Sequence, residues 1–179
     1  PFVSVRADAY RLHDILTGVG SGTRSESFNR GLATAGFDVS YPVFRRLKDA
    51  TIILEPVAQV AASPDAKQVV IGRTPTGDPV YLNEDSVAFE FDETTLFRSN
   101  KFPGYDLYED GVRLNVAGRA AVMWDDGRRA NLLVGRSFRS ERNDVFTDRS
   151  GLRTKASDWI VAADAQPILD AQTAWLRRY

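Results

Sequence analysis

Basic side chains gather in one stretch of the chain and are its strongest candidates for binding an acidic partner. The series comprises Arg128, Arg129, Arg136, Arg139, Arg142, Arg149, Arg153 and Lys155. Such groups bind phosphates or carboxylates through charge-assisted hydrogen bonds. Glu141, Asp144 and Asp148 are interleaved with them, so part of this charge is neutralised. A charged strand edge that prevents stray strand pairing is the alternative explanation of the pattern.

Carboxylates form a second candidate group, which comprises Asp85, Glu90, Asp92 and Glu93. A strand would place Glu90 and Asp92 on the same face, because successive side chains alternate between faces. Paired carboxylates hydrolyse glycosides in some enzymes and bind Mg²⁺ in others. The apolar residues that alternate over 87–91 favour a simpler explanation, in which the carboxylates lie on the solvated face of a half-buried strand.

Other reactive groups are scarce. The chain has no cysteine and one histidine, which excludes thiolate sites and multi-histidine metal sites. His13 and Asp14 are adjacent, so a helix would point them in different directions. Gly18, Gly20 and Gly22 lack the spacing of a phosphate-binding loop. We therefore expect no catalytic residue, no metal ligand and no cofactor.

Charge and hydropathy limit the classes of partner. The 179 residues carry a formal net charge of −1, without the basic surplus that nonspecific nucleic-acid binding needs. No apolar run approaches the length of a membrane-spanning helix. These observations predict a protein partner or self-association into a homo-oligomer, with no nucleic acid and no membrane contact.

Helices are predicted at both ends of the chain. Asp8 precedes a helical pattern over 9–16, and Thr23 to Glu26 has the form of a capping box before a second pattern that runs to Ala35. Asp164 caps a third predicted helix, whose apolar face includes Trp175.

Strand patterns fill the middle of the chain. Alternating or apolar runs predict strands at 51–54, 69–71, 80–82, 112–116, 120–124, 130–138 and 158–161. Two Asp-Gly pairs, Asp110-Gly111 and Asp126-Gly127, predict tight hairpin turns, because Gly tolerates the positive φ that these turns require.

The predicted fold is therefore α+β and mainly β, with an antiparallel sheet or partly closed barrel, two N-terminal helices and one C-terminal helix. We expect one domain over 1–179. It divides into a helical part at 1–48, a β-rich core at 50–138, a polar excursion at 139–157, and a C-terminal strand and helix at 158–179.

The function that these features favour is a non-enzymatic interaction or assembly protein, such as a structural subunit of a viral or phage particle or an inhibitor-type binder. We expect the excursion at 139–157 to contact the partner through an exposed aromatic anchor with a charged rim. The predicted partner-binding residues are Arg139, Arg142, Phe146, Arg149, Arg153 and Trp175. The alternative is a small-ligand-binding or hydrolytic enzyme on a β-barrel scaffold, with Tyr81, Glu90 and Asp92 as its polar groups.

Overall fold

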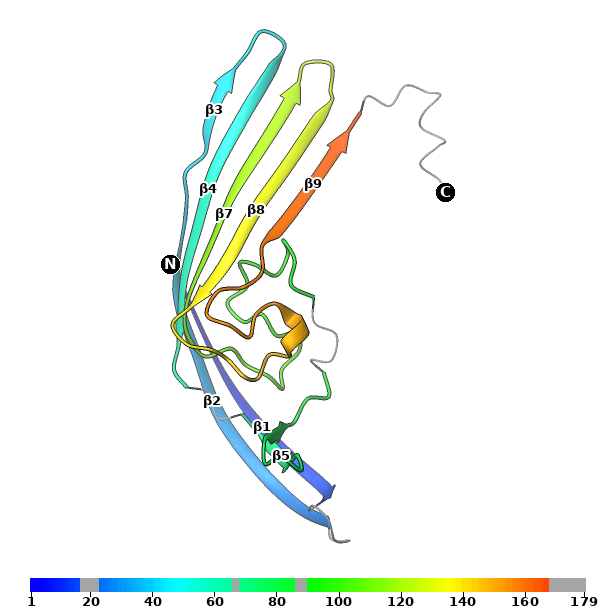
Figure 1. Cartoon of the computed structure of the whole chain (residues 1–179). Helices are drawn as coiled ribbons and strands as arrows, with labels where there is room; N and C mark the ends of the chain where they lie inside the picture. The colour runs from blue at the N-terminus through cyan, green and yellow to red at the C-terminus, as the bar shows by residue number, and fades with distance from the viewer. Residues whose placement is uncertain (17–22, 66–67, 86–89, 168–179) are drawn as a thin grey trace.

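The computed structural model of the chain describes residues 1–16, 23–65, 68–85 and 90–167, and everything below concerns these residues (Figure 1). Nearly all regular structure in them is β. The strands are β1 (Phe2–Leu16), β2 (Thr23–Ser40), β3 (Val43–Arg46), β4 (Ala50–Ser63), β5 (Val70–Arg73), β6 (Pro79–Tyr81), β7 (Gly111–Trp124), β8 (Arg129–Arg139) and β9 (Ile160–Gln166). A single 3₁₀ turn, η1 (Asp148–Ser150), lies between β8 and β9.

One large antiparallel sheet forms the body of the molecule. Its strands follow the order β1-β2-β4-β7-β8-β9, and β3 pairs with β4 beyond the end of β2. Pro42 lies between β2 and β3, where a residue without a backbone N–H interrupts the ladder. The sheet is long and curled like half of a barrel, as Figure 1 shows. The strands β5 and β6 form a separate small hairpin.

Both N-terminal helices of the predicted fold are wrong. Residues 9–16 belong to β1 and residues 23–35 to β2, and the two strands pair with each other from Phe2↔Gly36 to Leu16↔Thr23. Side chains in β1 alternate between apolar and polar, as in Val3, Ser4 and Val5, which is the period of a strand. The cap-like pattern at Thr23 is a local signal, and the pairing of two long strands overrides it.

The predicted C-terminal helix is also wrong where it should begin. Asp164 lies inside β9 and does not cap a helix, because β9 pairs with β8 from Gly135↔Ile160 to Arg129↔Gln166. The rest of this segment, from residue 168 onward and including Trp175, lies outside the described residues.

Several local strand predictions are confirmed. The β7–β8 hairpin turns through residues 125–128, with Gly127 at φ +90° and its N–H donating to the carbonyl of Trp124 over 3.0 Å. The hairpin of β5 and β6 surrounds 74–78, and residues 51–54 lie in β4. The turn expected at Asp110-Gly111 is wrong, because Gly111 instead begins a single strand that joins the two predicted at 112–116 and 120–124.

Two long connections pack on the concave side of the sheet and form one unit there (Figure 1). We call the described residues of 64–110 and 140–159 the inner body. Its own apolar core contains Phe102, Leu107, Phe146 and Leu152. A second cluster joins it to the sheet, where fully buried Leu96 packs against Ala117 and Ile160.

Gly135 makes room for Leu96. A Cβ built on Gly135 would lie 2.4 Å from Leu96 Cδ2 and 3.0 Å from both the Ala117 Cβ and the Val116 carbonyl oxygen. These distances are too short for a side chain, so glycine at this position lets the inner body approach the strand backbone.

We expect Gly135→Ala to lower the free energy of unfolding by about 1–3 kcal/mol, because the added methyl group overpacks a buried contact. Gly118→Ala is the matched control, since a Cβ at Gly118 meets nothing within 4 Å. Urea titration of the purified, folded protein measures both. Equal stability of the two variants would show that Leu96 does not rest on Gly135.

Candidate functional site

The two faces of the sheet differ sharply in chemistry, and adjacent rows of side chains show the difference. One row crosses β2, β4, β7 and β8 through Phe37, Val60, Leu114 and Phe138. The next row crosses the same strands through Asp38, Gln59, Asn115 and Ser137. Because side chains alternate between faces along each strand, the apolar row lies on the convex face and the polar row on the concave face.

The polar row forms a continuous hydrogen-bond chain under the inner body. Gln59 Nε2 donates to Asp38 Oδ1 over 2.7 Å, Asn115 Nδ2 donates to Gln59 Oε1 over 2.7 Å, and Ser137 Oγ donates to Asn115 Oδ1 over 2.6 Å. Gln59 also donates to the carbonyl of Phe97 in the inner body over 2.8 Å. Gln59, Asn115 and Ser137 are buried, and these bonds satisfy polar groups that burial would otherwise penalise.

A buried charge cluster anchors the inner body at the end of β7 and β8. Glu109 lies at its centre, with Arg139 Nη2 2.5 Å from one carboxylate oxygen and the Lys101 and Arg113 nitrogens each 3.8 Å from the other. The side chains of Lys101, Glu109 and Arg113 are fully buried. We call these four residues the Glu109 cluster.

Arg113 ties this cluster to the backbone. Its Nη1 donates to the carbonyls of Glu109, Asp110 and Gly111 over 3.0–3.1 Å, and its Nη2 donates to the Ser99 carbonyl over 2.8 Å. Three cations therefore surround one carboxylate, and the pKa of Lys101 is lowered. Burial lowers that pKa to about 8; Glu109 opposes the shift, and the Arg139 and Arg113 charges reinforce it.

A second contact holds the inner body to β1 and β2. The carbonyl oxygen of Tyr105 accepts hydrogen bonds from Arg30 Nη2 over 2.5 Å and from Arg6 Nη2 over 2.6 Å. Arg30 is itself paired with Asp8, Nε to Oδ2, at 2.8 Å. The inner body is thus bound to the sheet at both ends by buried or half-buried arginines.

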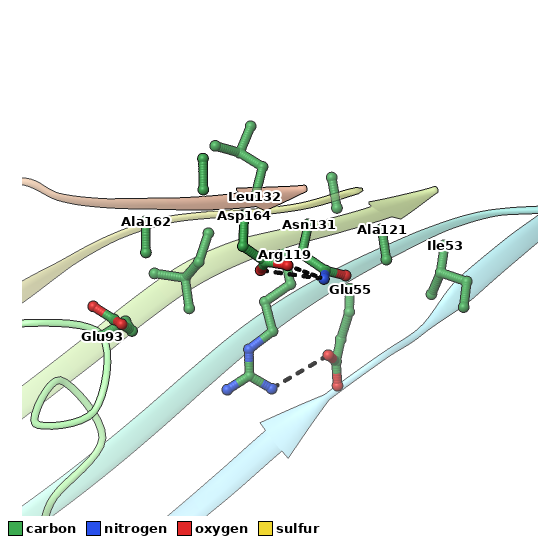
Figure 2. Close-up of a pocket in the computed structure, with 12 residues that line it drawn as sticks. Ile53, Glu55, Glu93, Arg119, Ala121, Asn131, Leu132, Ala162 and Asp164 are labelled. Atoms are coloured by element: carbon green, nitrogen blue, oxygen red, sulfur yellow. Dashed lines mark hydrogen bonds and ion pairs between the residues drawn. The ribbon is translucent and has the colours of Figure 1, made fainter. Parts of the chain in front are cut away.

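The concave face is open beyond the inner body, and a cavity of about 510 Å³ lies there (Figure 2). Two neighbouring rows of the sheet supply most of its lining. One row is Glu55, Arg119, Leu133 and Ala162, and the other is Ile53, Ala121, Asn131 and Asp164. Glu93 of the inner body borders the cavity from the other side. We call this space the concave cavity.

Polar groups in the concave cavity are paired along each row. Arg119 Nη1 donates to Glu55 Oε2 over 3.3 Å, and Asn131 Nδ2 donates to both carboxylate oxygens of Asp164 over 3.0 and 3.2 Å. Figure 2 shows these two pairs at separate places on the sheet. The apolar side chains Ile53, Ala121, Leu133 and Ala162 complete the two rows.

The residues predicted to bind a partner lie in different environments. Arg139 belongs to the Glu109 cluster, and its guanidinium carbon lies 4.5 Å from the Phe146 ring centre. Phe146 is only 2% exposed and stacks on Phe102 with ring centres 4.1 Å apart, so its side chain is not a surface anchor. Most of its neighbours in sequence are polar, which is why the sequence predicted an exposed side chain at a position that lies in the core.

Arg142, Arg149 and Arg153 are more accessible. Arg142 and Arg153 both pair with Asp144 Oδ1, at 2.6 and 3.1 Å, and these hydrogen bonds hold the pKa of the Asp144 carboxyl below its usual value. Arg149 is exposed. A partner-binding role for these three arginines stays a prediction, and Trp175 lies outside the described residues.

Asp92, one member of the predicted carboxylate pair, has a local structural role. Asp92 Oδ1 accepts hydrogen bonds from the backbone N–H groups of Thr94 and Thr95, each over 3.0 Å. Burial raises the pKa of Asp92, but the bonds from Thr94 and Thr95 outweigh it and leave the pKa below its usual value. Among the described residues, no group of three or more His, Cys, Asp or Glu side chains is placed to hold a metal ion.

The convex face is apolar over most of the sheet. Its exposed members include Val3, Val5, Phe37, Val39, Leu54, Val60, Val112, Leu114, Leu132 and Val161. Phe37 and Leu54 are each 54% exposed, and Val161 is 66% exposed. Arg136 is a charged exception, and its guanidinium lies against the rings of Phe138 and Trp159. A continuous apolar surface of this kind marks a contact with a membrane or another protein.

No described helix is long and apolar enough to cross a membrane.

Comparison with protein-family models gives a match over most of the chain. A family model described as "LptD: LPS transport system D" matches residues 1–172. No curated protein and no solved structure matches the chain.

We expect Phe146→Ala to lower the free energy of unfolding by about 3–5 kcal/mol, because it removes a buried ring from the core of the inner body. Phe44→Ala is the control, since Phe44 is 76% exposed and should change stability by less than about 0.5 kcal/mol. Urea unfolding followed by tryptophan fluorescence compares them. An unchanged midpoint for Phe146→Ala would contradict its place in the core.

Stability should also depend on pH through Lys101. Between about pH 8 and 10.5 the unfolded chain binds the Lys101 proton and the folded chain does not, so the free energy of unfolding rises with pH across this window. Lys101→Met lacks this contribution. We expect the free energy of unfolding of the wild type, relative to that of Lys101→Met, to rise by on the order of 2 kcal/mol from pH 7.5 to pH 10. Parallel pH profiles of the two proteins would show that folding does not lower the pKa of Lys101.

Proposed function

The chain belongs to the LptD family, and from this premise we propose that its curled sheet is a membrane-embedded part of an LPS transport protein of the outer membrane. This membership corrects the functions expected from sequence. A structural subunit of a virus or phage particle, an inhibitor-type binder and a general assembly role are all wrong, as is the expectation that the protein makes no membrane contact.

The apolar convex face is the observation that carries the proposal. A strand that crosses a bilayer alternates lipid-facing apolar side chains with side chains that face a polar interior. The rows from Phe37 to Phe138 and from Asp38 to Ser137 follow this rule on four strands. Water offers no stabilisation to the exposed Leu54, Val60 and Leu132 side chains, whereas the hydrocarbon interior of a bilayer does.

Backbone hydrogen bonding fits the same environment. In a bilayer every N–H and C=O must be satisfied within the protein, and the long antiparallel ladders do this for the strands inside the sheet. β4 and β7 pair without a register shift from Ala50↔Trp124 to Ser63↔Gly111. β4 and β7 each have 14 residues, more than the roughly 9–11 residues that a tilted strand needs to cross the hydrocarbon.

The concave face then supports passage of the polar part of the transported molecule. The inner body covers the middle of this face, and the concave cavity lies beside it. A path along the concave face would keep polar groups away from lipid, in contact with side chains such as Arg119 and Asn131.

A charged substitution on each face tests this function in cells whose only copy of the full-length protein is the variant. Leu132→Arg places a charge on the convex face in the middle of β8, and we expect a cost of about 2–4 kcal/mol for membrane assembly, with less folded protein and less LPS at the cell surface. Asn131→Arg, on the adjacent concave position, should assemble normally.

The amount of heat-modifiable folded protein in isolated membranes gives the assembly readout, and surface labelling of LPS gives the transport readout. Normal assembly of Leu132→Arg would contradict lipid contact on the convex face. Loss of assembly without any loss of LPS at the surface would contradict the transport role.

A further inference from the structure

We infer that Arg136, Phe138 and Trp159 form a binding site for the phosphate group of a membrane lipid on the convex face of the sheet. The site depends on the proposed lipid contact of this face. It lies on the face opposite to the concave cavity, so it is separate from any path of the transported molecule along the concave side.

Arg136 is an isolated charge in an apolar wall. By strand alternation, the convex positions are the even-numbered residues of β4, β7 and β8 and the odd-numbered residues of β9. Each of these positions holds an apolar residue or glycine, except position 136. Arg136 forms no ion pair with any described residue, so no carboxylate in that part of the chain neutralises its guanidinium.

Arg136 lies near one boundary of the apolar wall. It is three residues before the end of β8, and its row crosses β7 at Val116 and β4 at Ala58. The last convex position of β4 is Ala62, roughly 13 Å beyond Ala58 along the strand. The long side chain of an arginine spans much of that distance and brings its charge toward the membrane surface.

The connections between strands show which boundary this is. The end of the sheet near Arg136 carries the long connections at 64–110 and 140–159, and the other end carries the short turns at 47–49 and 125–128 (Figure 1). Strands of outer-membrane proteins have short turns on the periplasmic side and longer loops on the outside. The headgroups that Arg136 reaches are therefore those of the outer leaflet.

The guanidinium of Arg136 is held in one orientation. Its Nε donates to the carbonyl oxygen of Ser157 over 2.7 Å, and its central carbon lies 5.6 Å from the ring centre of Phe138 and 5.3 Å from that of Trp159. Ser157 is buried in the inner body, so this anchor is part of the folded protein. Nη1 and Nη2 make no hydrogen bond to described residues. The two terminal nitrogens are therefore available as a pair of parallel donors.

A phosphate group matches these donors. Two parallel N–H groups of a guanidinium bind two oxygens of one phosphate, and the attraction between the charges is strong where water is scarce. The rings of Phe138 and Trp159 are 37% and 63% exposed, so they offer apolar surface to the glycerol and the first methylene groups of the same lipid. A free phosphate would use only the donors, whereas a lipid uses the donors and the rings together.

Native mass spectrometry of the purified full-length protein in detergent resolves individual bound lipids and tests the site. The probes are phosphatidic acid, the simplest lipid with a phosphate headgroup, and diacylglycerol with the same acyl chains, which lacks only the phosphate. We expect phosphatidic acid to bind the wild type at least about tenfold more tightly, because charge-assisted hydrogen bonds form only with the phosphate. Equal binding of the two lipids to the wild type would overturn the site without the use of any variant.

Arg136→Gln removes the charge and keeps a polar side chain. We expect it to weaken phosphatidic acid binding about tenfold and to leave diacylglycerol binding within about twofold of the wild type, because only the charge-assisted contact is lost. Arg129→Gln is the matched control, since Arg129 is an exposed arginine on the concave side of the same strand. It should bind phosphatidic acid as the wild type does. An equal loss of binding in both variants would show general attraction of charge and overturn the site.

The remaining outcomes distinguish the ligand and the function. Excess inorganic phosphate should leave phosphatidic acid bound, because the free ion makes no contact with the rings; displacement would assign the site to a free anion and overturn the lipid headgroup. A wild type that binds both lipids equally would leave the lipid contact of the convex face intact. A wild type that binds neither lipid would contradict that contact and, with it, the proposed function.

Discussion

A polar concave surface can be covered only by groups that satisfy it, and this constraint shapes the whole molecule. The inner body covers Gln59, Asn115 and Ser137 because these side chains bond to one another and to the carbonyl of Phe97. The same constraint holds for charge in the Glu109 cluster, where a buried carboxylate is surrounded by buried cations. Removing Glu109 would leave three buried cations without their carboxylate, so the connections that carry Lys101 and Phe146 depend on its position.

The opposite face follows from the same strands. In the polar row, Gln59, Asn115 and Ser137 turn toward the inner body, and each is followed in sequence by an apolar residue that turns outward. Val60 and Leu114 are therefore exposed for the same geometric reason that Gln59 and Asn115 are buried. Family membership, the apolar convex face and the polar concave cavity together support the proposed arrangement, in which lipid lies outside and the transported molecule inside.

Local signals in the sequence predicted the local parts of this fold. The β7–β8 turn at Gly127 and the small hairpin of β5 and β6 depend on a few adjacent residues, and both are present. The N-terminal helices were mispredicted because Thr23 and Glu26 form a cap-like pattern, while the competing strand signal depends on pairing with another segment, Thr23 with Leu16 and Glu26 with Leu12. The half-barrel shape depends on registers between strands, which no short segment encodes.

The candidate site was harder to predict for a related reason. Glu109 immediately precedes the pair Asp110-Gly111, which was predicted to form a turn, and Phe146 was predicted to be an exposed anchor. Both are buried by residues that lie far away in sequence, such as Arg139 and Phe102. The cavity residues Glu55, Arg119, Asn131 and Asp164 come from four different strands. Alternation assigns each residue to one of the two faces of its own strand. Placing these four residues on the same face of the sheet also requires the pairing of the strands, which the sequence does not give.

The alternation of lipid contact along β4 tests the central claim most directly. The chain has no cysteine, so single cysteines carrying a spin label can be placed at Ile52, Leu54, Ala58 and Val60 and compared with Ile53, Glu55, Val57 and Gln59 in the full-length protein in lipid vesicles. We predict that the even-numbered positions are accessible to oxygen dissolved in lipid and protected from a water-soluble nickel chelate, and that the odd-numbered positions lack this preference. Equal access of the nickel chelate to both sets would contradict a lipid-facing convex surface.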